Sequence, residues 1–244
     1  MPDVRRCLWL SVLLVLGGCS SATIDRTGWG PVEGTRSDAS SALLLVDAYP
    51  ELQTPGSRSF QLDGKGTTGP GRFGASRIDG ALHLLVEVDG VDPPITDRTI
   101  EIAGDGTATI PRMIERDRGV LNVFEPPLVL FPTALEAGDE FTQELELRVY
   151  PLETPKKLKE RASTTLTITD LGVEQYVLGD GGDSIPTRAV RHVLAMDFGP
   201  AIVRSTTDRW FVPGRGLVAE ESEVVVKVFG LEVERSRSVL RATE

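Results

Sequence analysis

Apolar and polar residues alternate along most of this chain, and the period of two constrains the fold more than any other feature. Successive side chains of a β-strand point to opposite faces, so this alternation marks strands with one buried face, as in antiparallel sheets. The clearest apolar rows are Leu82/Leu84/Val86/Val88, Phe141/Leu145/Leu147/Val149, Thr164/Leu166/Ile168 and Val224/Val226/Val228. An antiparallel all-β protein is therefore predicted.

Turn signals separate these rows at short intervals. Aspartate-glycine pairs between alternating runs are strong hairpin signals, and they occur at Asp63-Gly64, Asp79-Gly80, Asp89-Gly90, Asp105-Gly106 and Asp180-Gly181. The spacing predicts roughly a dozen strands, which is too many for one flat sheet. We expect a single strongly curved antiparallel sheet or half-open barrel over residues 42–244, with little helix and with a β-sandwich as the alternative.

The start of the chain has the layout of an export signal. An arginine pair at residues 5–6 precedes an apolar run from Leu8 to Leu16. This run is too short to span a bilayer, which takes about 18 or more apolar residues. It ends in Leu16-Gly17-Gly18-Cys19. That segment resembles the lipobox of bacterial lipoproteins, which implies cleavage before Cys19 and a diacylglyceryl group on its thiol.

The resemblance to lipoproteins also implies a location. Residues 1–18 are expected to be a lipoprotein signal peptide, and acyl chains on Cys19 would hold the mature chain at a membrane, since two or more chains anchor stably. In Gram-negative lipoproteins an Asp after the Cys favours the inner membrane. Ser20 stands there, which implies the outer membrane, with the body facing the periplasm.

Residues 19–41 are predicted to be a flexible tether between the anchor and the body, because Ser, Thr, Gly, Asp and Arg dominate there. Trp29 lies within this stretch. It is expected either to sit at the lipid interface, where Trp is favoured, or to pack loosely on the body.

Composition excludes several kinds of function. Cys7 would be removed with the signal peptide, and Cys19 would carry the lipid. The mature body is therefore expected to have no disulfide, no thiol catalysis and no Cys-metal site. Loss of residues 1–18 removes two Arg and one Asp, which moves the formal charge from −10 to −11. An acidic body argues against binding nucleic acid or an anionic membrane surface.

Residue patterns that suggest catalytic or ligand chemistry are weak. Residues 64–69 match a dinucleotide fingerprint, but Pro70-Gly71 follows where that mechanism needs a helix, so we interpret them as a hairpin loop. Residues 180–183, Asp-Gly-Gly-Asp, are interpreted as a turn rather than a calcium site. His192 is expected to be a hydrogen-bonded residue in or near the core, and His83 to face outward. We therefore predict no enzyme, no cofactor and no metal site.

Two charged clusters are interpreted as solvated surface. Glu220, Glu221 and Glu223 are expected on a solvated strand. Residues 156–161 predict either one or two helical turns or a charged hairpin arm, whose lysines could also meet a phosphate headgroup or an acidic partner.

The most specific pattern of the body runs from Trp210 to Val218. Pro213-Gly214 predicts a tight turn, and Gly216 can supply a positive φ. Together with Phe131–Asp139 upstream, this segment resembles a Trp-aromatic-x-Pro-Gly-x-Gly-x-Val motif of uncharacterised exported bacterial β proteins, over residues 128–241. The resemblance implies a β fold and implies no activity.

Three functional hypotheses follow. The first is a non-enzymatic, membrane-anchored lipoprotein that acts as a binding or scaffold module of the cell envelope, with an unknown protein or lipid partner. The second is a carrier of lipids or other apolar ligands in a concave β cavity. The third, which we favour least, is an envelope hydrolase that uses His192 or His83.

Overall fold

Strands dominate the computed structural model, which describes residues 28–39, 41–64, 67–136, 138–178 and 183–243. The elements are β1 (Gly30–Pro31), β2 (Leu43–Leu44), α2 (Leu45–Ala48), η1 (Pro50–Leu52), β3 (Gly56–Gly64), β4 (Thr67–Ile78), β5 (Ala81–Val88), β6 (Val91–Ile102), β7 (Ala108–Glu115), β8 (Val120–Phe131), β9 (Ala134–Leu135), β10 (Glu140–Pro151), β11 (Glu160–Val177), β12 (Ser184–Asp197), β13 (Ala201–Val212), β14 (Gly216–Val228) and β15 (Leu231–Ala242). No helix among the described residues is long and apolar enough to cross a membrane.

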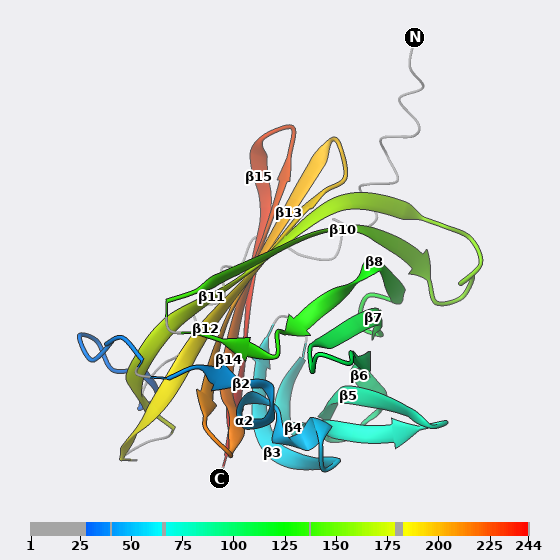
Figure 1. Ribbon diagram of the computed structural model, residues 1–244. Coiled ribbons are helices and arrows are strands. Elements are labelled where there is room, and N and C mark those ends of the chain that lie inside the picture. Colours follow the sequence, from blue (N-terminus) through cyan, green and yellow to red (C-terminus); the bar gives the residue numbers. More distant parts are fainter. Residues whose placement is uncertain (1–27, 40, 65–66, 137, 179–182, 244) are drawn as a thin grey trace.

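Twelve antiparallel strands form one closed ring (Figure 1). Strands β3 to β8 and β10 to β15 each pair with the next strand along the chain, and β8 pairs with β10. The ring closes because β15 pairs with β3, with Ser238 opposite Gly64 and Ala242 opposite Phe60. The predicted all-β, curved antiparallel architecture is confirmed. The predicted half-open barrel is wrong, because this long-range pairing joins the two edges.

Alternation along each strand divides the side chains between the lumen and the outer wall. The predicted rows on β5, β10 and β11 face inward, where Leu84, Leu147 and Ile168 are buried. The predicted Asp79-Gly80 turn joins β4 to β5, and both of its residues have positive φ, as a two-residue hairpin turn requires.

One end of the barrel is closed by the segment from β2 to η1, residues 43–52, which we call the plug. Its buried side chains, Leu45, Ala48, Tyr49 and Leu52, belong to the same core as the strands. Against it lies the β13–β14 turn, where Gly216 has φ +81°. A Cβ at Gly216 would come within 2.8 Å of Pro50 and 3.2 Å of the Ala48 carbonyl oxygen. The predicted Pro213-Gly214-x-Gly216 turn is confirmed, and its second glycine makes room for the plug.

Three aromatic rings join the plug to two strands of the wall. Tyr49 lies 5.3 Å from Phe211 on β13 and 6.1 Å from Phe131 on β8, and these two rings are 6.1 Å apart, all in edge-to-face arrangements. In the ring of strands, β8 and β13 are separated by β10, β11 and β12. Side chains from separated strands therefore meet inside the barrel, which fills the lumen at the plug end.

A buried ion pair fixes the plug to the wall beside these rings. The Asp170 carboxylate accepts hydrogen bonds from Arg188 at 2.5 and 2.9 Å and from the backbone N–H of Gly138 at 2.8 Å and Gly172 at 3.1 Å. Arg188 also donates to the Ser41 carbonyl oxygen at 2.7 Å, just before the plug. Because both the Asp170 carboxylate and the Arg188 guanidinium have hydrogen-bond partners, the ion pair is stable in the interior of the protein.

The backbone pairing between β8 and β10 is interrupted part of the way along these strands, and we call this place the seam. Their backbone pairing runs from Val120 to Glu125 on β8 and stops before Pro126, which has no N–H to donate. Beyond it, the Gln143 side chain spans the seam by accepting from the Val129 N–H at 3.0 Å and donating to the Pro127 carbonyl oxygen at 2.9 Å. A side-chain bridge therefore replaces the backbone ladder there.

We predict that the Tyr49→Ala substitution lowers the free energy of unfolding by about 3–5 kcal/mol, as expected for a buried aromatic ring whose loss leaves a cavity. Tyr49→Phe keeps the ring contacts and should cost about 1 kcal/mol or less. Urea unfolding of the two variants measures both values. Equal losses for Ala and Phe would contradict the role of the ring.

Candidate functional site

Charged side chains meet across the lumen directly above the plug. Arg209 on β13 donates to Glu220 on β14 at 2.7 Å. Arg98 on β6 faces inward opposite Leu84, and its pKa responds to the charges of both Glu220 and Arg209. Strands β6 and β13 are opposite each other in the ring, so these groups span its interior. We call Arg98, Arg209, Glu220 and the Tyr49 hydroxyl the polar floor.

The protonation states of the polar floor follow from its burial and its charges. Burial acts to raise the pKa of Glu220, but Arg209 and Arg98 outweigh this effect and hold the pKa below its ordinary value. Burial raises the pKa of Tyr49 to about 12. At neutral pH the floor therefore presents one carboxylate, two guanidinium groups and a neutral phenol.

Arg98 differs from Arg209 in its contacts. Among the described residues, its guanidinium group makes no hydrogen bond and has no carboxylate within 4.0 Å, whereas Arg209 is paired with Glu220. Burial lowers the pKa of Arg98, the effect expected of a cation that has been partly removed from water.

His192 lies on β12 next to this floor. It faces inward opposite Ile168 and Thr207 and is 7% exposed, which confirms the predicted core position. Its Nε2 atom is buried and has no hydrogen-bond partner among the described residues, so the expected hydrogen bond is not found at this atom. Burial, followed by the charge of Arg209, holds the pKa of His192 well below 6.5, and the ring is neutral.

Above the floor, the inward-facing side chains are only half-buried. The apolar ones are Leu62, Leu194, Met196, Val203, Val224 and Val226, and polar side chains on the same face include Ser205, Ser236 and Glu234. Eight strands make a ring that side chains can fill, and twelve make a wider one. Because the plug fills only one end, we call the other part the open half of the lumen. The Val224/Val226 row, predicted from its pattern to be buried, is half-exposed for this reason.

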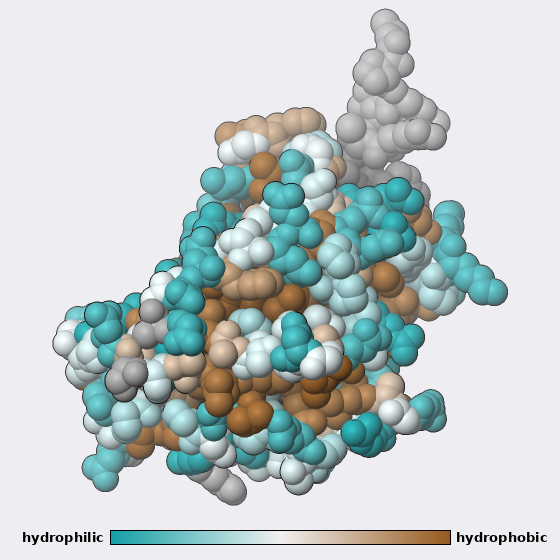
Figure 2. Space-filling view, in the orientation of Figure 1, coloured by the Kyte–Doolittle hydropathy of each residue, from teal (hydrophilic) through white to brown (hydrophobic). Residues whose placement is uncertain are grey.

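Apolar residues also surround the open end of the barrel. Phe229 and Leu231 on the β14–β15 hairpin are 78% and 73% exposed. Val91 on β6, Ile202 on β13 and Val233 on β15 are exposed at the same end. Figure 2 shows hydrophobic side chains at the tip of this hairpin, at the top of the view, and a second group in the middle of the same face. We call the five residues the apolar rim.

The outer wall carries the second histidine, as predicted. His83 on β5 lies 2.6 Å from Asp97 on β6, Nδ1 to Oδ1, and Ser76 on β4 is its cross-strand neighbour. Ser76 lines an open cavity of about 340 Å³ with Ser57 and Glu87. No hydrogen bond joins Ser76 to His83 in the described part of the chain, so the link between base and nucleophile that a hydrolase needs is not formed there.

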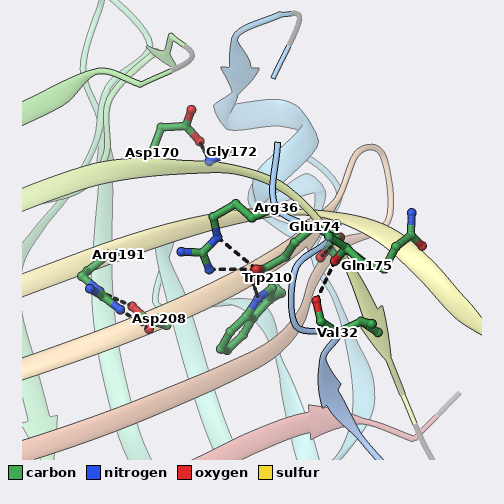
Figure 3. Close-up of polar contacts among 11 residues, drawn as sticks. Val32, Arg36, Asp170, Gly172, Glu174, Gln175, Arg191, Asp208 and Trp210 are labelled. Carbon is green, nitrogen blue, oxygen red and sulfur yellow. Dashed lines mark hydrogen bonds and ion pairs between the residues drawn. The ribbon is translucent and has the colours of Figure 1, made fainter. Parts of the chain in front are cut away.

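Residues 28–39, within the predicted tether, lie along the outer wall, and we call them the strap. Figure 3 shows Arg36 and Trp210 converging on Glu174 of β11. Arg36 donates to one carboxylate oxygen at 2.8 and 3.0 Å, and Trp210 to the other at 2.6 Å. Trp29 is buried, with the Arg241 guanidinium 4.7 Å from its ring centre. Trp29 thus packs firmly on the body, while Cys19 lies outside the described residues.

The remaining sequence candidates are placed as follows. Gly64 pairs with Thr67 across the β3–β4 hairpin, so the fingerprint-like stretch joins two strands. Residues 156–159 form the exposed turn of the β10–β11 arm, not a helix. Of the turn at 180–183, only Asp183 is described. Within the described residues there is no group of three or more potential metal ligands.

Sequence reasoning missed the polar floor. The sequence analysis expects Glu220 on a solvated strand, but Glu220 continues the inward row of Val226, Val224 and Ser222 and faces Arg209. One signal was available on β13, where Arg209 follows Val203, Ser205 and Thr207 in the inward row and precedes Phe211. A charge within such a row indicates a polar position inside the barrel.

We predict that His192 makes folding sensitive to acid. Its pKa is lowered in the folded state, so below about pH 6.5 the unfolded chain takes up a proton that the folded chain does not, and the free energy of unfolding falls by up to about 1.4 kcal/mol per pH unit. In His192→Gln this contribution should disappear. Urea unfolding at pH 7.5, 6.0 and 5.0 measures the free energy of unfolding of both proteins. If this free energy falls equally with pH in the unchanged protein and in His192→Gln, the prediction is wrong.

Comparison with known proteins leaves the function to be argued from these residues alone, because no protein-family model, curated protein or solved structure matches the chain.

Proposed function

We propose that this chain is a lipid-anchored, non-enzymatic binding module of the bacterial cell envelope, which takes up apolar ligands in the open half of its lumen. One observation carries the proposal. In a closed ring of twelve strands, inward-facing apolar side chains such as Leu194, Met196 and Val224 are still reached by solvent.

The composition of the lumen supports an apolar ligand. Binding sites for small molecules are concave and mostly apolar, with a few polar groups that fix orientation. The open half supplies a mixed wall of apolar side chains interspersed with Ser205, Ser236 and Glu234, and the polar floor supplies a group of charges at its base. The apolar rim surrounds the entrance, and exposed apolar surface of this kind often marks a contact site.

The anchor rests on the N-terminal sequence. Residues 1–18 are proposed as a signal peptide and Cys19 as the lipidated residue, with Ser20 favouring the outer membrane and the barrel facing the periplasm. The membrane is then a partner through acyl chains alone, and no nucleic acid, metal or cofactor enters the proposal.

A hydrolase is the weaker alternative. The His83–Asp97 contact on the outer wall is the observation that favours it. Ser76 stands beside His83 as its cross-strand neighbour, but no hydrogen bond between them occurs in the described residues.

The anchor is tested by Cys19→Ser. We expect the unchanged chain to fractionate with membranes and the variant to appear in the soluble envelope fraction, because acyl chains supply the binding energy, about 0.8 kcal/mol per buried methylene. Mass spectrometry of the mature N-terminus should find the acyl groups on Cys19. A variant that stays with membranes would show that another part of the chain anchors it.

The lumen is tested by two neighbouring substitutions on β14. Val224 faces inward and Val225 outward, and both are half-buried. Val224→Asp should weaken binding of a neutral apolar fluorophore about ten-fold or more, because a charge enters the apolar wall. Val225→Asp should leave binding unchanged, since it lies opposite Arg204 and Arg235. Equal effects of both substitutions, measured by fluorescence titration, would place the site elsewhere.

A further inference from the structure

The polar floor holds more positive than negative charge. Arg98 and Arg209 face Glu220, and the next inward carboxylate that acts on Arg98 is Glu115. Glu115 is already engaged by Arg118 at 3.2 Å and by Asn122 at 3.0 Å. The floor itself thus holds two guanidinium groups and one carboxylate, and the hydrogen bond of that carboxylate goes to Arg209. The unpaired group is Arg98.

A second polar group at the floor also has no partner. The Nε2 atom of His192 is buried and unpartnered in the described structure, on a ring that faces the lumen and is 7% exposed. His192 lies opposite Thr207, one inward position from Arg209 on β13, and the charge of Arg209 acts on the pKa of both His192 and Arg98. A neutral imidazole in the Nε2–H tautomer and a guanidinium group are both hydrogen-bond donors, and both suit an anion.

The surroundings make this cation unusual. The mature body carries a predicted formal charge of −11, from −10 for the whole chain less the net +1 of residues 1–18. Arg98 is partly buried and shares the charge of Glu220 with Arg209, so an anionic group that reaches it adds a charge-assisted hydrogen bond. Low-dielectric walls strengthen that attraction.

We propose that the polar floor binds the anionic head group of an amphiphile, with Arg98 as the charged contact and His192 as a donor, while the apolar chain of the ligand lies along the open half of the lumen. This inference rests on the proposed function and adds the ligand class to it. Arg209 lies eight positions beyond Ala201, the first residue of β13 at the open end, which is a span of about 26 Å along the strand. That length accommodates an extended dodecyl chain.

The test compares three probes that share a chain and differ in the head group: dodecanoate, dodecyl phosphate and dodecanol. Each is titrated against the full chain carrying Cys19→Ser, so that acyl groups on the protein cannot occupy the lumen, and displacement of the neutral fluorophore gives the affinity. We expect the dissociation constant of at least one anionic probe to be lower than that of dodecanol by a factor of about ten or more, which is the effect of one charge-assisted hydrogen bond. The tighter anion identifies a carboxylate or a phosphate head group.

Variants of Arg98 assign the effect to this residue. Arg98→Met should abolish the preference for anions, measured as the ratio of the dissociation constants of dodecanol and of the tighter anionic probe. Arg98→Lys, which keeps the charge, should retain the preference within about three-fold. Arg204→Gln removes an exposed, outward-facing guanidinium from β13 and serves as the control with the same loss of charge. Thermal unfolding checks that each variant is folded.

The outcomes separate this inference from the function on which it rests. If neither dodecanoate nor dodecyl phosphate binds more tightly than dodecanol, or if the preference survives in Arg98→Met, the head-group site is refuted and the apolar lumen stands. If neither the fluorophore nor any amphiphile binds to the folded chain, the proposed function fails and this inference fails with it.

Discussion

The contact of Tyr49 with Phe131 and Phe211 is the interaction on which the rest of the structure depends. Twelve strands enclose more space than the side chains of their own walls fill. These three rings occupy that space at one end, and each belongs to a different part of the chain: the plug, β8 and β13. Gly216 and the Asp170–Arg188 pair hold the plug in register with them. Without this packing the barrel would have two open ends and no base for a binding site.

The polar floor depends on the same packing. The Tyr49 ring fills the lumen below Arg209 and Glu220, so the ion pair lies in a partly dry environment where its attraction is strong and its geometry is fixed. The hydroxyl of the same residue belongs to the floor. The Tyr49 side chain thus separates the filled, aromatic half of the barrel from the solvent-accessible half. The charges of the polar floor lie at the boundary between these halves.

The extent to which this architecture follows from the sequence depends on the distance over which each signal acts. Alternation and aspartate-glycine turns are local, and they predicted the strands and hairpins, including the inward row from Leu82 to Val88. Closure depends on β15 meeting β3, which no local pattern records. Glu220 shares the parity of Val224 and Val226, so the local alternation already placed it on the inward face, and only its charge suggested a solvated position. The row at Val224 and Val226 had the right periodicity, but whether it meets core or water depends on where the plug ends.

Docking of the strap onto Glu174 determines which end of the barrel is presented to which compartment. Residues 28–39 run along the wall at the plug end, near the β11–β12 and β13–β14 turns. With Cys19 lipidated as proposed, eight residues separate it from Gly28, and even a fully extended segment of that length reaches only about 30 Å. The filled end is then the one held beside the anchoring bilayer. The apolar rim, at the opposite end of the strands, is turned toward the aqueous space and toward whatever surface faces the membrane across it.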